Sequence, residues 1–299
     1  MNLLKKPFAY AIIFGFFLAS LFSYSLLKTF VLSQAMTSVQ SKSTTATSKL
    51  SSGQTEQTEN SYKDDHLNIT LIEKTVENTQ VYIADIQTDS ADFLKTALAN
   101  HTYGTNVTAK TSETAAANKA ILAVNGDYYG ANADGYVIRD GQIYRDSVRQ
   151  NADNGDLAIY KDGSFKIINE NEVTAQELVD QGVVNLLAFG PALIKDGDLA
   201  VGTNSEVGQS MASNPRTAIG IIDQNHYIII VSDGRTSESQ GLSLYQMAEL
   251  MKSYGVKTAY NLDGGGSSTL YFNGQVINKP TTNGTIKERA VSDIVYIGY

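Results

Sequence analysis

The longest hydrophobic run of the chain lies near its N-terminus, at residues 8–32, where Lys28 is the only charged residue. At a rise of ~1.5 Å per residue, about 25 residues make roughly 37 Å of helix, enough to cross a ~30 Å hydrocarbon core with some tilt. A cleaved signal peptide has a shorter apolar region of about 7–15 residues. Lys5 and Lys6 precede the run, and no basic cluster directly follows it. The pattern predicts a single-pass signal-anchor at the cell membrane, with residues 1–7 in the cytoplasm and the remaining chain outside it.

Residues 33–64 are predicted to form a flexible linker. Serine, threonine and glutamine dominate this stretch up to residue 60, and such a composition cannot bury enough apolar surface to order itself. Cleavage near Ala35 is the alternative to an anchor, and it would give a secreted protein. The folded domain is predicted over residues 65–299.

Within that domain the pattern is one of short strands joined by tight turns. Apolar residues alternate or cluster as in strands at residues 68–73, 80–86, 120–124, 217–222, 226–231 and 291–297. Aspartate-glycine or asparagine-glycine pairs predict hairpin turns at residues 140–141, 162–163, 196–197 and 273–274. Short helices are predicted at residues 91–99, 112–118 and 175–180. The predicted fold class is α+β, with a mixed, largely antiparallel sheet.

One segment departs from the hairpin pattern. A helix with one apolar face is predicted at residues 244–254, where Ser243 and Gln246 have capping-box spacing and Gly255 supplies the stop. An apolar run precedes this helix and another, at residues 257–262, follows it. Strand, helix and strand in this order predict a βαβ unit whose two strands run parallel.

Charged and polar residues follow the strands of this unit. Asp233 and Asp263 come just past the two strand ends, so both are expected at one edge of the sheet, where ligands of such sheets bind. The hairpin of residues 217–231 brings Arg216 and Arg235 to the same edge. This convergence is the strongest functional signal in the chain.

Two loops add to that edge. Asp263 is followed by Gly264, Gly265, Gly266, Ser267 and Ser268. Three successive glycines are costly to order, which indicates that the backbone approaches a ligand there; a plain turn is the alternative. The residues after strand 120–124 are Asn125, Gly126 and Asp127, and they fit a ligand site or a simple turn equally well.

Composition excludes several function classes. The net charge of −8 argues against a nucleic-acid partner. The absence of cysteine excludes disulfides and thiolate metal sites. The three histidines are scattered, so neither a multi-histidine zinc site nor a serine–histidine triad is expected. The glycine loop also lacks the residues that define a Walker A loop, a dinucleotide fingerprint or a nucleophile elbow.

The remaining chemistry points to a sugar joined through phosphate. Two reachable carboxylates suggest glycosidic-bond chemistry. Arginine binds phosphate or carboxylate in bidentate fashion. The successive N–H groups of residues 264–267 could form an anion-binding nest. A phosphate leaving group needs little protonation, so a strong general acid is dispensable.

Five segments, taken in order, resemble the phosphodiester glycosidase family, which includes the lysosomal enzyme that uncovers mannose 6-phosphate and bacterial exopolysaccharide-related proteins. They are Asn125-Gly126-Asp127-Tyr128-Tyr129, Gly190-Pro191-Ala192, Asn214-Pro215-Arg216-Thr217, Asp233-Gly234-Arg235 and residues 261–268. The resemblance covers residues 115–299. It implies hydrolysis of an α-glycosyl phosphodiester with an N-acetylglucosamine-like sugar, in cell-wall or exopolysaccharide metabolism.

The resemblance also implies roles for individual residues. Asp263 and Asp233 become catalytic candidates, and Arg216 and Arg235 become phosphate binders. Substrate or phosphate contacts are expected from Asn125, Gly126, Asp127, Gly264, Gly265, Gly266, Ser267 and Ser268. The position of Asp127 is glycine in many relatives.

Two alternatives stay open. A non-catalytic module could use the same arginines and tyrosines to hold an anionic polysaccharide. Although no cofactor is required, Asp233, Asp263 and Asp127 could together bind Ca²⁺ or Mg²⁺, which prefer oxygen ligands. The expected partners are a sugar-phosphate or polysaccharide substrate and, through the N-terminal helix, a membrane.

Overall fold

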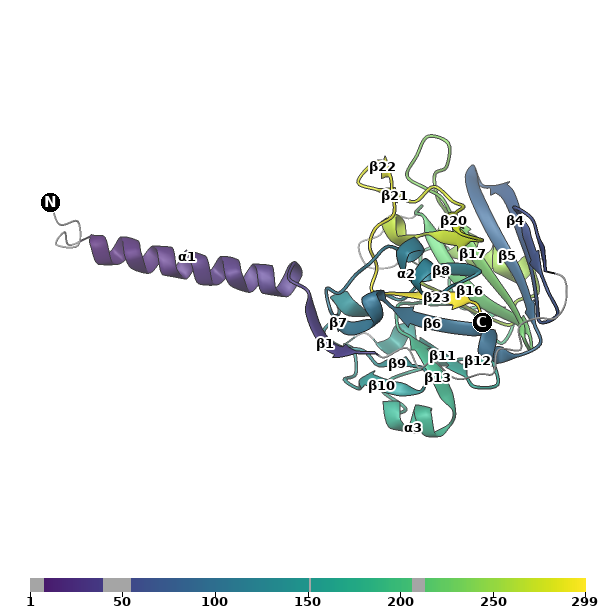
Figure 1. Cartoon of the computed structure of the whole chain (residues 1–299), viewed down its shortest axis with the longest axis horizontal. Coiled ribbons are helices and arrows are strands. Elements are labelled where there is room, and N and C mark those ends of the chain that lie inside the picture. Colours follow the sequence, from purple (N-terminus) through teal and green to yellow (C-terminus); the bar gives the residue numbers. More distant parts are fainter. Residues whose placement is uncertain (1–7, 40–54, 151, 206–212) are drawn as a thin grey trace.

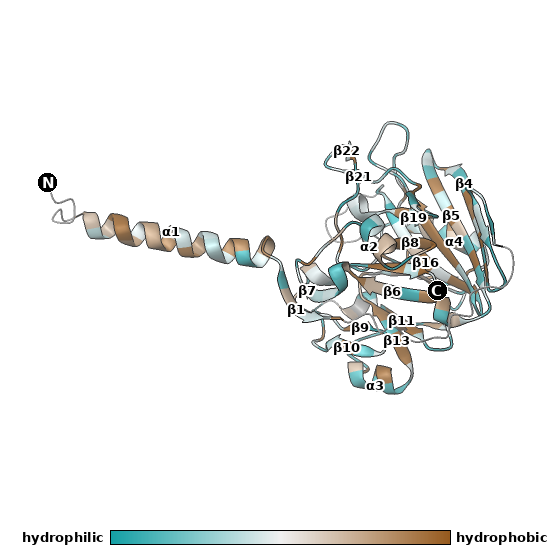
Figure 2. Ribbon diagram, viewed as in Figure 1, coloured by the Kyte–Doolittle hydropathy of each residue, from teal (hydrophilic) through white to brown (hydrophobic). Residues whose placement is uncertain are grey.

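A long helix, α1 (Ala9–Phe30), projects from a domain built mainly of sheets (Figure 1). The computed structural model describes residues 8–39, 55–150, 152–205 and 213–299. Within them, α1 is the one helix long and apolar enough to cross a membrane. Most of its residues are apolar (Figure 2), and its large apolar side chains are exposed, as expected for residues 8–32. The predicted cytoplasmic residues 1–7 lie outside the described part.

The chain after α1 differs from the uniformly flexible linker that was expected. β1 (Gln34–Ser38) pairs antiparallel with β7 (Thr102–Thr105). β2 (Glu56–Gln57) and β3 (Ser61–Lys63) extend the edge of the largest sheet. A sheet edge offers backbone hydrogen bonds to a polar segment as readily as to an apolar one, so composition alone did not reveal these strands. Residues 40–54 of the linker lie outside the described residues.

The largest sheet has nine strands in the order β15-β14-β18-β16-β17-β5-β4-β3-β2. Every pairing described in it is antiparallel. Its remaining members are β4 (Leu67–Val76), β5 (Thr79–Thr88), β14 (Ala192–Lys195), β15 (Asp198–Leu199), β16 (Arg216–Asp223), β17 (His226–Ser232) and β18 (Thr258–Asn261).

Two five-stranded sheets complete the core. The first has the order β10-β9-β13-β11-β12 and the second β20-β19-β8-β23-β6. Their strands are β6 (Leu94–Leu98), β8 (Leu122–Asn125), β9 (Val137–Arg139), β10 (Gln142–Arg145), β11 (Asp156–Tyr160), β12 (Phe165–Ile168), β13 (Val183–Leu187), β19 (Leu270–Phe272), β20 (Gln275–Val276) and β23 (Asp293–Ile297). A small hairpin, β21 (Thr281–Thr282) and β22 (Thr285–Ile286), lies apart from them.

The main hydrophobic core joins the three sheets. Buried side chains of β4, β5, β16 and β17 pack against those of β8, β11, β19 and β23. On the other face of the nine-stranded sheet, α4 (Leu244–Ser253) buries Leu244, Met247 and Met251. Both faces of the strands that end in Asp233 and Asp263 are therefore covered, which holds those strand ends in place.

Most predicted elements are confirmed. The four turn pairs close β9–β10, β11–β12, β14–β15 and β19–β20. α2 (Thr111–Ala117) and α3 (Ala175–Asp180) lie where helices were expected. The helix predicted at residues 91–99 is wrong. A single 3₁₀ turn (Ala91–Phe93) precedes β6, which pairs with β23 along its length. Pairing with β23 therefore outweighed the local helical preference of this segment.

The predicted βαβ unit is present with one strand inserted. β17 and β18 run in the same direction, and β16 lies between them, antiparallel to both. Their C-terminal ends therefore lie at the same edge of the sheet, as predicted.

Candidate active site

The two loops predicted to meet at that edge are hydrogen-bonded to each other. The backbone N–H of Asp263 donates to the carbonyl of Gly126 at 3.2 Å. The Asn125 side-chain amide donates to the Asp263 carbonyl at 2.6 Å. Asn125 also accepts from Thr217 at 2.8 Å and from the N–H of Thr269 at 3.3 Å. It is fully buried, so it fixes the three strand ends relative to one another instead of facing a substrate.

The carboxylate of Asp263 lies at the centre of the site. Its Oδ2 accepts from Ser267 Oγ at 2.5 Å and from Arg289 Nη2 at 3.0 Å, and its Oδ1 accepts from the N–H of Gly264 at 2.8 Å. Arg289 also donates to Ser267 Oγ, through Nε at 2.9 Å and Nη2 at 2.6 Å. The Asp263 side chain is 9% exposed and that of Arg289 is 41% exposed, so the guanidinium lies between the carboxylate and solvent.

Burial raises the pKa of Asp263, while Arg289, Ser267 and the N–H of Gly264 oppose the rise. Desolvation penalises the charged carboxylate and the neighbouring cation favours it. A carboxylate whose ionisation depends on one half-exposed arginine is responsive to any ligand that competes for that arginine. Perturbed carboxylates of this kind cluster at functional sites.

The glycines after Asp263 allow close packing of the loop. Gly265 has φ +61°, and a Cβ there would lie 2.9 Å from Arg235 Nη2. A Cβ at Gly264 would lie 2.9 Å from the carbonyl of Pro215, and one at Gly266 would lie 2.5 Å from Thr282 Oγ1. The predicted anion-binding nest is not open, because the N–H groups of residues 264, 265 and 267 already donate to protein acceptors. Instead, the absence of a side chain at Gly265 lets the loop backbone pack closely against Arg235.

The second predicted carboxylate, Asp233, is held by three donors. Its Oδ1 accepts from Asn278 Nδ2 at 3.1 Å and from the N–H of Lys279 at 2.9 Å, and its Oδ2 accepts from Tyr82 at 3.3 Å. Asn278 also donates to the carbonyl of Ser268 at 2.9 Å, which ties Asp233 to the glycine loop. Burial raises the pKa of Asp233, and these donors lower it in part.

The two predicted phosphate binders differ in exposure. Arg216 is 3% exposed, pairs with Ser232 in the β16–β17 register and donates through Nε to the carbonyl of Leu242 at 2.7 Å. Arg235 is exposed, has a left-handed φ of 61°, and donates to Asn214 Oδ1 at 2.9 and 3.1 Å. With Gly265 beneath its guanidinium, Arg235 presents its charge at the mouth of the site.

Below the site lies a buried ion-pair group that the sequence did not reveal. Arg139 Nη2 lies 3.0 Å from Asp127 Oδ2 and 2.6 Å from Asp293 Oδ2. The N–H of Asp127 donates to Asp293 Oδ1 at 3.2 Å, and a Cβ at Gly126 would lie 2.1 Å from that oxygen. Both carboxylates are fully buried. Asp127 and Gly126 thus support the loop from beneath, which differs from the substrate contacts expected of them.

Burial and the neighbouring Asp127 raise the pKa of Asp293, and Arg139 opposes them. Arg289 and Asp293 lie four residues apart in the sequence, but they do not pair with each other. The structure pairs each with a different partner. Arg289 contacts Asp263, and Asp293 contacts Arg139.

Tyr128 completes the rim of the site, and sequence reasoning assigned it no role. Its φ is +67°, its side chain is 42% exposed, and its ring centroid lies 6.0 Å from Arg289 Cζ. An aromatic side chain held in the left-handed region is uncommon and signals a constraint. This backbone conformation, which the sequence does not show, identifies Tyr128 as a candidate site residue.

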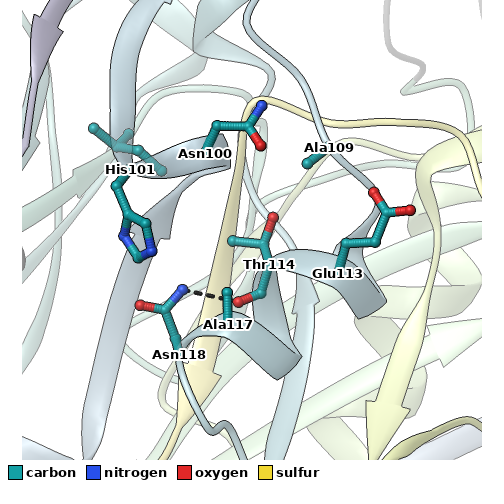
Figure 3. Close-up of a pocket in the computed structure, with 8 residues that line it drawn as sticks. Asn100, His101, Ala109, Glu113, Thr114, Ala117 and Asn118 are labelled. Atoms are coloured by element: carbon teal, nitrogen blue, oxygen red, sulfur yellow. Dashed lines mark hydrogen bonds between the residues drawn. The ribbon is translucent and has the colours of Figure 1, made fainter.

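Within the described residues, no group of three or more histidine, aspartate or glutamate side chains is placed to hold a metal. A pocket of about 150 Å³ lies beside α2, lined by Leu98, Asn100, His101, Ala109, Glu113, Thr114, Ala117 and Asn118 (Figure 3). None of the predicted site residues lines it. The candidate site is therefore the edge around Asp263 and not this pocket.

Comparisons with known proteins identify the family of the chain. The family model for phosphodiester glycosidases matches residues 118–298. The chain is 33% identical over 184 residues to the SPbeta prophage-derived uncharacterized protein YomE of Bacillus subtilis, covering 60% of this chain and 28% of that protein. It is 30% identical over 190 residues to human N-acetylglucosamine-1-phosphodiester alpha-N-acetylglucosaminidase, covering 58% of this chain and 36% of the human protein. The chain thus spans about a third of the length of these curated relatives.

A solved structure shares the fold. The catalytic domain of zebrafish N-acetylglucosamine-1-phosphodiester alpha-N-acetylglucosaminidase, auto-inhibited by its pro-peptide, superposes with a TM-score of 0.61 at 23% identity, covering 90% of this chain and 88% of that one. At this identity the likeness establishes the architecture alone.

Proposed function

The chain belongs to the phosphodiester glycosidase family, and on this premise we propose that it hydrolyses an α-glycosyl phosphodiester whose sugar resembles N-acetylglucosamine. The observation that carries the proposal is the contact of the buried Asp263 carboxylate with Ser267 and Arg289, beside the exposed Arg235. The site therefore combines the carboxylate of Asp263 with two cationic side chains, the half-exposed Arg289 and the exposed Arg235. A glycosyl phosphodiester presents the matching features, an electrophilic anomeric carbon and an anionic leaving group.

In the proposed reaction the bond between the anomeric carbon and the phosphate oxygen breaks, and water supplies the hydroxyl that replaces it. The phosphate leaves as an anion, with the bonding electron pair. Arg235 and Arg289 would neutralise its charge through their planar guanidinium forks. Asp263 would face the positive charge that develops at the anomeric carbon. The remaining proton of water passes to solvent.

The other predicted residues would position these groups. We assign Asp233 to holding the loop, because Asn278, Lys279 and Tyr82 already occupy its oxygens. We assign Arg216 to fixing the start of β16, where it is buried. Tyr128 would lie beside the sugar, since aromatic rims commonly contact apolar faces of ligands.

For localisation we propose that α1 anchors the chain in a cell membrane, with the domain outside the cytoplasm. A role in cell-wall or exopolysaccharide metabolism is part of the same proposal. Cleavage near Ala35 would give a secreted form instead, and it would cut within β1.

The test is turnover of a panel of sugar-1-phosphodiesters and plain aryl glycosides by the full chain. We expect sugar release from the phosphodiesters alone. Saturable binding of anionic polysaccharide with no release from any compound would overturn the hydrolase proposal in favour of a binding module.

A further inference from the structure

The base of α1 is fixed to the domain by specific contacts. Asn106 Nδ2 donates to the carbonyl of Thr29 at 3.1 Å and to that of Leu32 at 3.5 Å. Ser33 Oγ donates back to the carbonyl of Asn106 at 2.9 Å. The last carbonyls of a helix have no partner within the helix, so a side chain that binds them acts as a cap. Here the cap comes from the domain, 77 residues further along the chain.

The strand after α1 continues this attachment. β1 follows the end of α1 that lies next to the domain, and it pairs with β7 (Figure 1). A Cβ at Gly104 would lie 2.1 Å from the carbonyl of Gln34, so the lack of a side chain at Gly104 lets β1 approach. Tyr103 of β7 stacks on Tyr129 with ring centroids 5.4 Å apart. The helix is therefore joined to the domain without an intervening flexible segment.

The same part of the domain contacts the segments that carry Tyr128 and Arg289 of the candidate site. The N–H of Asn106 donates to the carbonyl of Gly130 at 3.0 Å, two residues after Tyr128. Ala109 and Val291 exchange backbone hydrogen bonds at 3.0 and 2.8 Å, two residues after Arg289. In Figure 1 the segment between β22 and β23 runs down the side of the domain that faces α1.

The end of α1 is therefore connected to the candidate site through a few residues of the domain, among them Asn106 and Ala109. A roughly 33 Å helix placed across a bilayer would hold residues 104–109 at the membrane surface. Tyr128 and Arg289 would then lie next to the headgroups. A domain on a flexible tether would sample all orientations relative to the membrane. The attachment of α1 and β1 restricts the orientation of this domain.

We propose that the site acts on glycosyl phosphodiesters whose aglycone is embedded in the bilayer, that is, on lipid-linked sugar phosphates at the membrane surface. This inference rests on the proposed function and on the anchor. The attached helix and the lipid tail hold the enzyme and its substrate at the same membrane surface. The phosphodiester therefore reaches Arg235 and Arg289 at high effective concentration.

The experiment uses the full chain in phosphatidylcholine–phosphatidylglycerol vesicles. The probes are an N-acetyl-α-glucosaminyl phosphodiester of a long-chain alcohol, embedded in the same vesicles, and its methyl phosphodiester in solution. We expect kcat/KM to be about tenfold or more higher for the embedded probe. Equal turnover of both probes would overturn the inference and leave the proposed function intact. Turnover of neither would overturn the proposed function itself.

Two variants test the role of the attachment. Asn106→Gly keeps a residue that accepts the left-handed φ of 56° but removes the cap on α1. A Gly-Ser insertion of about 20 residues between Leu32 and Ser33 keeps β1 and frees the helix. Both should lower the preference for the embedded probe severalfold and leave turnover of the methyl probe unchanged. Asn78→Gly, at the left-handed turn between β4 and β5, is the matched control. An unchanged preference in both test variants would contradict the proposal.

Discussion

Arg289 donates to the carboxylate of Asp263 at 3.0 Å, and it also donates to Ser267, whose hydroxyl donates to the same carboxylate. These three side chains form a closed set of hydrogen bonds at the end of β18. The set determines both the charge of Asp263 and its orientation.

Asp263→Asn should lower kcat by at least about 1000-fold, because the amide cannot stabilise positive charge at the anomeric carbon. Circular dichroism and the melting temperature should stay close to those of the parent protein. Asp223→Asn is the control, since that carboxylate is exposed and pairs with Lys257 on the surface. Full activity of the Asp263 variant would remove this residue from the mechanism.

Arg289→Met should lower kcat/KM by on the order of 100-fold and change its pH dependence. Arg289 opposes the rise that burial causes in the pKa of Asp263, so its removal raises that pKa further. Activity needs the ionised carboxylate. The acidic limb of the pH profile should therefore move to higher pH in the variant. An acidic limb at the parental position would show that Asp263 does not control it.

Gly265→Ala should destabilise the fold by about 1–2 kcal/mol, because φ is +61° there and the new Cβ would meet Arg235. Displacement of that guanidinium should raise KM for phosphodiesters. Gly274→Ala is the matched control: its φ of +92° brings the backbone strain, but nothing lies within 4 Å of the new Cβ. Equal kinetic effects in the two variants would mean that contact with Arg235 is irrelevant to substrate binding.

Arg139→Met should cost about 3–5 kcal/mol of stability, because it leaves the Asp127 and Asp293 carboxylates buried without their cation. The expected measurement is denaturant unfolding of the variant and of Lys252→Met, which removes an exposed ion pair with Asp198. The exposed pair should contribute less than about 1 kcal/mol. Comparable losses in both variants would contradict a structural role for the buried group.

Stability should also depend on pH through Asp293. Its pKa is raised in the folded protein, so the folded state keeps a proton that the unfolded chain releases at lower pH. This contribution is fully present below the ordinary pKa of aspartate and is lost as the pH rises through the folded value. Asp293→Asn should flatten that part of the stability profile. A profile identical to that of the parent would show that Asp293 does not titrate there.

Turnover should survive exhaustive chelation. Joint binding of Ca²⁺ or Mg²⁺ would need the free carboxylates of Asp127, Asp233 and Asp263, but each carboxylate is bound by its own protein donors. The measurement is kcat after dialysis against EDTA, with and without either ion restored. Loss of activity that Ca²⁺ or Mg²⁺ reverses would establish a metal requirement.

Several features of the site followed from the sequence. The apolar runs and the turn pairs specified strands, α4 and the hairpins, because those signals depend on residues close together in the chain. The order of strand, helix and strand then placed Asp233 and Asp263 at one edge. The hairpin of residues 217–231 predicted Arg235 at the same edge, and the structure presents it at the surface beside Gly265.

The sequence by itself determined most elements of the domain, the apolar N-terminal helix and the identity of the loops that meet. Only the tertiary structure decided which charges pair. Arg289 reaches Asp263 across 26 residues, and Asp127 meets Asp293 across 166. It also decided that β1 attaches the helix to β7. Such contacts depend on which strands become neighbours, and no local pattern encodes that choice, because a polar segment or a charged side chain can be satisfied by many partners.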